Sequence, residues 1–271
     1  SVSRCNARCS VIHPTAVIAA GAVLGTGVDV GPHAVIDANV VLGDGCRIGP
    51  HVYLTGHTRI GAGTVIHAGA VIGDVPQDLH FDGSVSHTAI GSHCILREHV
   101  TVHRGAGAGT TTVIGDQVML MAGTHVAHNC RIGNHVIVAN ASLLGGHVEV
   151  QDRAFLSGLV AVHQFVRIGT LAMVGGMNRL TQDIPPYCLF QEQSVQGVNV
   201  VGLRRAGCPP ATRSTLRRAV KIFFFAGLNR PSAVRRIREE CEAFPEIEEF
   251  LRFVEGAKRG ITRGRGTAAD V

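Results

Sequence analysis

The 271-residue sequence contains no tryptophan, only 4% aromatic residues and only 17% charged residues. No apolar run approaches the roughly eighteen residues of a membrane-spanning helix. The N-terminal segment Ser1 to Ser10 is not followed by the apolar stretch of a signal peptide. We therefore expect a cytoplasmic protein without stable membrane insertion.

Several chemical signatures are also missing. The eight cysteines are scattered without a Cys-x-x-Cys pair, which predicts reduced structural thiols. There is no Gly-x-Ser-x-Gly motif and no visible Ser/His/Asp set, so direct transfer is favoured over an acyl-enzyme. Neither a Gly-x-x-x-x-Gly-Lys-Ser/Thr loop nor a dinucleotide fingerprint is present. The basic residues lack interleaved stacking aromatics, which argues against nucleic acid as a partner.

What the sequence does contain is 34 glycines and a repeat of six residues. Aliphatic residues recur every sixth position from Ile12 to Ile72, at Ile90, Leu96 and Val102, and from Ile114 to Leu180. A period of six fits neither an α-helix nor a lone strand. It fits a solenoid in which each hexad is a short parallel strand plus a corner, with three hexads closing one coil of about 18 residues.

The repeat divides the chain into a mainly β region and a helical end. We predict a tail at 1–11, a parallel β-helix at 12–190 with loop insertions at about 74–88 and 103–112, a connector at 191–208, a helical domain at 209–258 and a disordered tail at 259–271. The expected helices run over Pro210 to Ala226, Pro231 to Phe244 and Pro245 to Lys258.

The helical end is basic. From Arg204 onward there are fifteen Lys and Arg against eight Asp and Glu. Arg213, Arg217 and Lys221 recur every fourth residue and therefore share one helix face. This stripe is a candidate docking surface for an acidic partner, with a solvated helix face as the alternative.

Histidines are concentrated in the repeat between Leu120 and Gln164. Counting in coils of about eighteen residues places the hexads of Val126, Leu144 and Val162 on one face. Histidine exchanges protons near neutral pH, and a backbone N–H such as that of Gly146 can stabilise an oxyanion. A histidine base could thus activate a sugar hydroxyl to attack an acyl carbonyl. The expected column contains His128, His147 and His163, with His125 at the corner that enters it.

The order of motifs resembles the UDP-N-acetylglucosamine O-acyltransferases of lipid A biosynthesis over nearly the whole chain. The motifs are Val75-Pro76-Gln77-Asp78-Leu79, Thr101-Val102-His103-Arg104-Gly105, His125-Val126-Ala127-His128, Gly145-Gly146-His147, Ala161-Val162-His163-Gln164-Phe165, Gln182-Asp183-Ile184-Pro185-Pro186-Tyr187 and Gly197-Val198-Asn199 through Gly202-Leu203-Arg204-Arg205.

The resemblance implies a left-handed β-helix and a homotrimer with active sites between subunits. It implies transfer of an (R)-3-hydroxyacyl group from acyl carrier protein to the 3-hydroxyl of UDP-N-acetylglucosamine, the first step of lipid A biosynthesis. The donor travels on the carrier's phosphopantetheine arm, so neither a further cofactor nor a metal is expected. By motif, His128 resembles the general base, Gly146 the oxyanion donor, His125, His147 and His163 positioning residues, Gln77 and Asp78 sugar contacts, and Gln164, Asn199 and Arg205 nucleotide contacts.

Two positions depart from the family pattern. Asn129 follows the candidate base where relatives often have Asp, which predicts a weaker base. His80 stands where relatives often carry Lys near the diphosphate, so substrate affinity is expected to fall as pH rises through its titration.

Other functions are compatible with parts of the sequence. A γ-carbonic-anhydrase-type metalloenzyme shares the fold and uses histidines, but its two ligands five positions apart have no counterpart here. The N-acyltransferase that acts later in the pathway would need an additional N-terminal domain. A related enzyme that uses another sugar nucleotide, such as a 3-amino analogue, and a non-catalytic scaffold that binds the carrier protein are the remaining alternatives.

Overall fold

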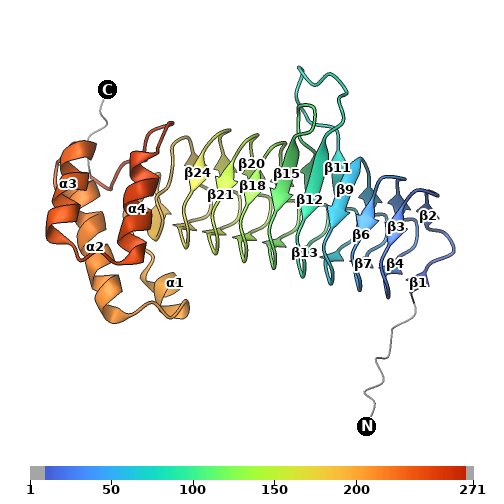
Figure 1. Ribbon diagram of the computed structural model, residues 1–271, viewed down its shortest axis with the longest axis horizontal. Helices are drawn as coiled ribbons and strands as arrows, with labels where there is room; N and C mark the ends of the chain where they lie inside the picture. Colours follow the sequence, from blue (N-terminus) through green and yellow to red (C-terminus); the bar gives the residue numbers. More distant parts are fainter. Residues whose placement is uncertain (1–9, 267–271) are drawn as a thin grey trace, which may run out of the picture.

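The computed structural model describes residues 10–266, which form a long prism of parallel strands with a helical cap at one end (Figure 1). Residues 1–9 and 267–271, including Cys5 and Cys9, lie outside the described part. The other six cysteines are free thiols, in agreement with the prediction for them. Within residues 10–266, no helix combines the length and apolar character needed to cross a membrane.

Three parallel sheets form the walls of the prism. Sheet A has eleven strands, of which the last pairs antiparallel. Their bounds are β1 (Val11–Ile12), β4 (Asp29–Val30), β7 (Arg47–Ile48), β10 (Val65–Ile66), β13 (Ile95–Leu96), β16 (Met119–Leu120), β19 (Ile137–Val138), β22 (Phe155–Leu156), β25 (Met173–Val174), β27 (Cys188–Gln191) and β28 (Ser194–Val198).

Sheet B carries the histidine region. Its nine strands are β2 (Val17–Ile18), β5 (Val35–Ile36), β8 (Tyr53–Leu54), β11 (Val71–Asp74), β14 (Thr101–His103), β17 (His125–Val126), β20 (Leu143–Leu144), β23 (Ala161–Val162) and β26 (Arg179–Leu180).

Sheet C completes the triangle. Its eight strands are β3 (Val23–Leu24), β6 (Val41–Leu42), β9 (His57–Ile60), β12 (His87–Ile90), β15 (Thr111–Ile114), β18 (Arg131–Ile132), β21 (Glu149–Val150) and β24 (Arg167–Ile168).

The hexad explains why most strands have only two residues. One residue of each pair points into the prism and the other points out, and a corner follows at once. Val126, Leu144 and Val162 pair in register, and all three are buried. Corners adopt a left-handed backbone conformation, as at Asn129 with φ 61°. The predicted parallel β-helix, mainly β and followed by helices, is confirmed.

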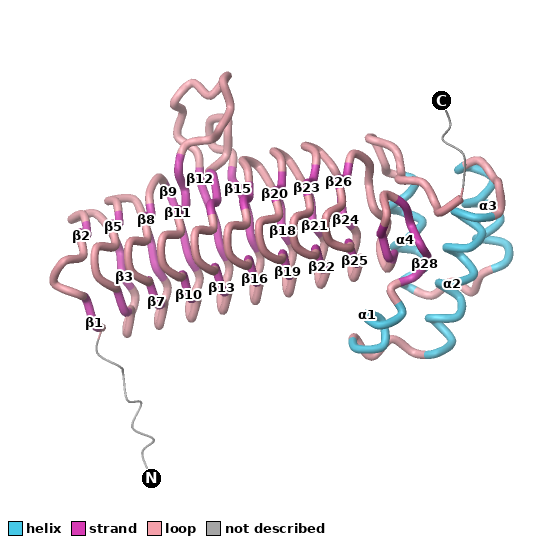
Figure 2. Tube along the Cα trace, turned by 180° about the vertical axis from the view of Figure 1, so that it is seen from behind, coloured by secondary structure: helices cyan, strands magenta, loops and turns pink. Residues whose placement is uncertain are grey.

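Two loops leave the prism where the repeat is interrupted. The first connects β11 to β12 over residues 75–86, and the second connects β14 to β15 over residues 104–110. Both rise from the same region of the prism wall (Figures 1 and 2). Arg104 of the second loop donates to the Gly73 carbonyl at 3.2 Å, and its guanidinium lies 5.5 Å from the Phe81 ring centroid. The second loop therefore supports the base of the first.

The C-terminal end closes the prism. The helices are α1 (Val200–Arg205), α2 (Pro210–Phe225), α3 (Arg230–Glu240) and α4 (Pro245–Glu255). The last three correspond to the expected helices, whereas α1 lies inside the predicted connector. The prediction of a disordered tail is wrong for residues 260–266, because Ile261 and Gly264 form parallel bridges with Asp183 and Val195.

Polar contacts fix α4 to the last coils. Glu249 accepts hydrogen bonds from the Thr170 hydroxyl, at 2.5 Å, and from the Tyr187 hydroxyl. Arg167 donates to the buried Asp183 carboxylate and to the Phe253 carbonyl, both at 2.9 Å. The cap is thereby held to the β-helix at several points.

Candidate active site

A cavity of about 490 Å³ opens on the outer face of sheet B. Strands β17, β20, β23 and β26 supply its floor, and the first loop supplies Gln77 at its rim. Its lining residues are Gln77, His125, Ala127, His128, Leu143, Leu144, Gly145, Gly146, Ala161, Val162, His163, Gln164 and Arg179.

His128 lies at the end of the cavity nearest the first loop, with only 15% of its side chain exposed. Its Nδ1 is 2.9 Å from the Asn129 side-chain oxygen, and its Nε2 is 4.0 Å from an oxygen of Asp78. Its ring packs edge-on against His147, with 5.3 Å between the ring centroids. The first loop thus brings a carboxylate to the side of the imidazole opposite Asn129.

The protonation pattern of His128 follows from its neighbour. The backbone N–H of Ala106, in the second loop, donates to the Asn129 side-chain oxygen at 2.9 Å. A backbone N–H can only donate, so the oxygen of the Asn129 amide must be the atom that faces both Ala106 and His128. His128 Nδ1 then carries a hydrogen and donates it, which leaves the lone pair of a neutral ring on Nε2.

Gly146 lies directly beside that nitrogen. A Cβ built on Gly146 would be 2.6 Å from both Cε1 and Nε2 of His128, so only glycine permits this approach. Gly146 lies in a turn, and its N–H donates no backbone hydrogen bond within residues 10–266. This N–H is therefore available to an oxyanion close to His128 Nε2.

His125 is held by residues of the preceding coil. The Thr101 hydroxyl is 2.7 Å from His125 Nδ1, and the ring of His103 packs edge-on at 4.7 Å. Burial, with smaller contributions from His103 and His128, lowers the pKa of His125 to about 4. His125 is consequently neutral at physiological pH and suited to hydrogen bonding rather than to proton exchange.

The remaining histidines differ in exposure. The ring of His147 stacks on Phe165 at 4.6 Å, and burial, with a contribution from His128, lowers the pKa of His147. His163 and Gln164 are exposed, and both line the cavity. His163 Nδ1 lies 3.2 Å from the Gln164 carbonyl oxygen.

Asp78 and His80 form a pair on the first loop. The His80 backbone N–H donates to Asp78 at 3.0 Å, and this bond is the main cause of a lowered pKa for the Asp78 carboxyl. The His80 ring itself is 95% exposed and faces Asp78 at 3.3 Å. His80 therefore lies beside the site through Asp78 and does not line the cavity.

The register refines the expected histidine column. The predicted alignment of Val126, Leu144 and Val162 is confirmed. The histidines, however, lie at different distances along the chain from these residues: His128 two positions after Val126, His147 three after Leu144 and His163 one after Val162. The residue one coil after His128 is therefore Gly146, and the next residue, His147, donates its N–H to the His128 carbonyl at 3.0 Å. The three rings share a face without occupying equivalent positions.

Of the three residues expected from the motifs to contact the nucleotide, Gln164 lines the cavity, whereas Asn199 and Arg205 lie elsewhere in the single chain. Asn199 caps α1 by accepting from the Gly202 N–H at 2.9 Å and donates to the Leu171 carbonyl at 2.8 Å. Arg205 is exposed in the last turn of α1. Neither residue lines the cavity.

The basic stripe of α2 is divided. Arg217 and Lys221 are exposed, whereas Arg213 donates to the Cys208 carbonyl at 2.7 Å and is partly buried. Two of the three predicted docking residues thus present their charges to solvent.

Three site residues were not predicted from the sequence. Thr101 holds His125, Ala106 orients Asn129, and Arg179 lines the cavity. Arg179 could have been found by counting, since it follows His125 by three coils. Ala106 carried no signal because the contact uses its backbone.

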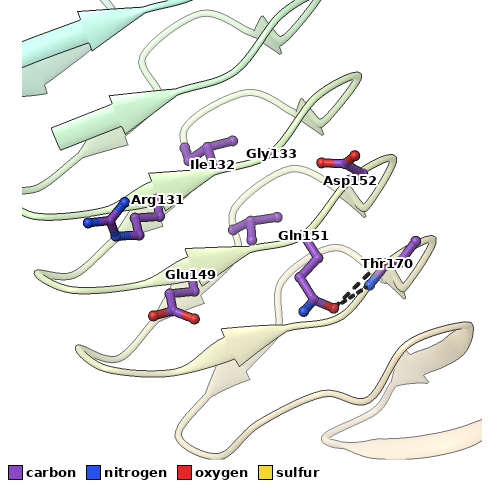
Figure 3. Close-up of a pocket in the computed structure, with 8 residues that line it drawn as sticks. Arg131, Ile132, Gly133, Glu149, Gln151, Asp152 and Thr170 are labelled. Carbon is purple, nitrogen blue, oxygen red and sulfur yellow. Dashed lines mark hydrogen bonds between the residues drawn. The ribbon is translucent and has the colours of Figure 1, made fainter. Parts of the chain in front are cut away.

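A second groove lies on sheet C (Figure 3). Arg131 and Glu149 project from the adjacent strands β18 and β21, and Gln151 accepts from the Thr170 N–H at 3.0 Å. The groove has no histidine or cysteine among its lining residues. Across residues 10–266, no three His, Cys, Asp or Glu side chains are grouped to hold a metal ion.

Two family models match segments of the chain. Residues 39–74 and 111–146 match the model described as bacterial transferase hexapeptide (six repeats). Residues 183–262 match the model described as UDP N-acetylglucosamine O-acyltransferase, domain 2.

Similar proteins cover nearly the whole chain. An acyl-[acyl-carrier-protein]–UDP-N-acetylglucosamine O-acyltransferase from Anaeromyxobacter sp. (strain Fw109-5) is 43% identical over 93% of this chain and 99% of its own length. The crystal structure of a UDP-N-acetylglucosamine acyltransferase from Bacteroides fragilis 9343 is 40% identical, with a TM-score of 0.90 over 93% of this chain and 99% of that one. The Arabidopsis UDP-N-acetylglucosamine acyltransferase is 31% identical, with a TM-score of 0.82 over 93% of this chain and 100% of its own.

Proposed function

The chain belongs to the UDP-N-acetylglucosamine O-acyltransferase family, and we propose that it transfers an (R)-3-hydroxyacyl group from acyl carrier protein to the 3-hydroxyl of UDP-N-acetylglucosamine, the first step of lipid A biosynthesis. The observation that carries the proposal is the orientation of His128. Its Nδ1 is occupied by Asn129, and its Nε2 faces Asp78 beside Gly146.

The reaction follows from these atoms. The sugar 3-hydroxyl gives its proton to His128 Nε2 while its oxygen attacks the thioester carbonyl carbon. The resulting oxyanion accepts a hydrogen bond from the Gly146 N–H. When the intermediate collapses, the carbon–sulfur bond breaks and the imidazolium returns its proton to the leaving thiolate. The acyl group thus moves directly, with no acyl-enzyme.

The surrounding residues position the sugar. Asp78, with a lowered pKa, is a carboxylate that can accept hydrogen bonds from sugar hydroxyls. Gln77 at the rim offers both a donor and an acceptor. The neutral His125, fixed by Thr101, adds a hydrogen-bonding group without competing for the proton.

A homotrimer is supported by the outer face of sheet A. Outward residues of successive strands pair in register along this sheet, and nearly all are apolar in the coils beside the cavity. Sheet C instead presents Arg131 and Glu149. A continuous apolar face on one chain indicates an interface. The stripe consists of Val65, Ile95, Met119, Ile137, Phe155 and Met173.

We propose that three subunits pack through this face and that the sheet B cavity of each lies against its neighbour. Asn199 and Arg205 could then reach the nucleotide in a site other than that of their own chain. Light scattering of the purified protein tests the assembly, with Met119→Glu as the disrupting variant. A monomeric wild-type protein would contradict it.

The donor is proposed to arrive on the phosphopantetheine arm of acyl carrier protein, with no further cofactor. The exposed cations Arg217 and Lys221 of α2 are suited to an acidic carrier surface. Their proposed role is to dock the carrier at the helical end of the prism.

One assay tests the function. Purified protein is incubated with a panel of hydroxyacyl carrier proteins and with either UDP-N-acetylglucosamine or its 3-amino analogue, and products are identified by mass spectrometry. We expect the O-acylated sugar nucleotide, and loss of turnover in His128→Ala with substrate binding and assembly retained. Turnover that survives in His128→Ala would remove the proposed base, and N-acylated product alone would favour the amino analogue.

A further inference from the structure

We propose that Arg179 binds a phosphate group of a substrate at the end of the cavity opposite the first loop. This inference rests on the proposed function, because both proposed substrates carry phosphate. It assigns a phosphate contact to a residue outside the motifs, Arg179.

The sheet register places Arg179 in line with the histidines. His125, Leu143, Ala161 and Arg179 are paired outward residues of β17, β20, β23 and β26. Strands lie about 4.8 Å apart, so the Arg179 backbone is roughly 14 Å from that of His125. The long Arg179 side chain can extend along the sheet towards His125. Leu143 and Ala161, which lie between them, have no polar side-chain atom that would bind the guanidinium.

Opposite charges lie near the two ends of the cavity. Asp78, which does not itself line the cavity, lies beside His128, and Arg179 is the one Lys or Arg among the cavity-lining residues. No Asp or Glu lines the cavity with it. Within the described chain, Arg179 has no ion pair within 4.0 Å. An exposed guanidinium without a carboxylate partner is available to an anionic ligand.

The backbone of Arg179 is fixed although its side chain is exposed. β26 is the last strand of sheet B, so its outer edge has no further strand to pair with. The Gln193 side chain, in the amide orientation that satisfies both contacts, donates to the Arg179 carbonyl at 2.7 Å and accepts from its N–H at 3.2 Å. The guanidinium therefore projects from a defined position on the sheet.

The ligand chemistry follows from the reacting group. The sugar hydroxyl at His128 is neutral, and so is the thioester it attacks. Apart from the acidic surface of the carrier protein, the charges of the substrates reside in the diphosphate of the sugar nucleotide and in the phosphodiester of the carrier's prosthetic arm. A guanidinium binds phosphate oxygens through paired N–H donors, so either group suits Arg179.

The test separates the two sources by steady-state kinetics. Arg179→Gln removes the charge, and Arg179→Lys retains it without the paired donors. The matched control is Arg131→Gln, an outward arginine at the equivalent strand position on sheet C. Because loss of one charged hydrogen-bonding group typically costs an order of magnitude in affinity, we expect about a tenfold rise in one KM for Arg179→Gln, with kcat within about twofold.

Which KM rises identifies the source. A rise for the sugar nucleotide assigns the diphosphate. A rise for the acyl carrier protein assigns the prosthetic arm if the same rise is found with the acylated phosphopantetheine arm alone as donor. Titration calorimetry with UDP and with uridine provides a readout independent of turnover. If the diphosphate is the ligand, Arg179→Gln weakens binding of UDP but not of uridine.

Three outcomes would overturn the proposal: both KM values unchanged in Arg179→Gln, a loss confined to kcat, or a change in oligomeric state with both KM values retained. The last would assign Arg179 to a subunit contact. Wild-type protein that transfers no acyl group at all would instead reject the proposed function. The two failures are therefore distinguishable.

Discussion

A Cβ on Gly146 would lie 2.6 Å from the Nε2 atom of His128, which is closer than non-bonded carbon and nitrogen atoms approach. The glycine backbone and the imidazole therefore share a space that has no room for a methyl group. The proposed oxyanion donor and the proposed base are held at contact distance by this fit.

Gly146→Ala should consequently inactivate the enzyme without unfolding it. The methyl group displaces the His128 ring, and small displacements of a catalytic group typically reduce rates about a hundredfold. The matched control is Gly158→Ala, at a corner where the added Cβ meets its nearest atom at 3.4 Å. We expect kcat to fall only in Gly146→Ala, with equal melting temperatures. Equal kcat values in the two variants would contradict the proposed geometry.

Asn129→Asp should increase the basicity of His128. A carboxylate could still accept from the Ala106 N–H and from His128 Nδ1, and its charge would stabilise the imidazolium form. We expect a higher plateau rate and an acidic limb of the pH–rate profile displaced to higher pH. Asn129→Gly removes the side chain at a positive φ without backbone strain and should lower the rate. An unchanged rate and profile in Asn129→Asp would remove the idea that Asn129 weakens the base.

Acidification should destabilise the fold through His125. Its pKa of about 4 lies below the ordinary 6.5, so the unfolded chain binds the proton first. The contribution of the neutral His125 to the free energy of unfolding is complete above pH 6.5 and is lost as pH falls towards 4, a loss on the order of 3 kcal/mol. Urea unfolding at pH 7 and 4.5 should show a smaller difference for His125→Gln than for wild type. The exposed His135→Gln serves as control, and an equal reduction there would refute the assignment.

Arg167→Met should loosen the junction between the β-helix and the helical cap. It would leave the carboxylate of Asp183, which is only 1% exposed, without its cation, and it would remove the guanidinium stacked 4.3 Å from the Phe253 ring centroid. Breaking a buried pair in this way typically costs about 3–5 kcal/mol. Denaturant unfolding measures the loss. The control variant Arg153→Gln, at an exposed corner, should unfold at nearly the same denaturant concentration as wild type. An equally small effect of Arg167→Met would argue against the role of Arg167 in holding the cap to the β-helix.

Arg217→Glu should weaken the use of acyl carrier protein. Reversing an exposed charge on α2 opposes an acidic carrier, so we expect its KM to rise about tenfold at low salt and the difference to shrink as salt is added. The KM for the sugar nucleotide should not change. The control variant is Arg153→Glu, which changes the net charge by the same amount but lies on a corner of the β-helix. A matching rise in that control would indicate a general charge effect rather than docking.

The repeat made most of the β-helix predictable from sequence. A buried aliphatic residue at every sixth position defines both the strand and the inward face, and Val126, Leu144 and Val162 align as counted. Corner residues were harder to place, because an offset of one position moves a side chain around the turn. His147 therefore stands beside His128 rather than above it.

Contacts made by the loops could not be obtained by counting. Asp78 reaches His128 from a segment outside the repeat, and Ala106 orients Asn129 through its backbone, which any residue but proline possesses. The short helix α1 was missed because six residues are too few to display helical periodicity. Residues 260–266 were expected to be disordered because their order comes from bridges to distant strands.

The coil length gives the cavity a discrete geometry. Val126 and Leu144 are paired although separated by one full coil in sequence, as are Leu144 and Val162. Insertion or deletion of one complete coil would preserve every face and change the separation of His125 and Arg179 by a single strand spacing, about 4.8 Å. Loss of a single hexad would instead rotate all later side chains onto the next wall. The distance between the two ends of this site can therefore change in evolution only in whole steps, while the chemistry at each end remains intact.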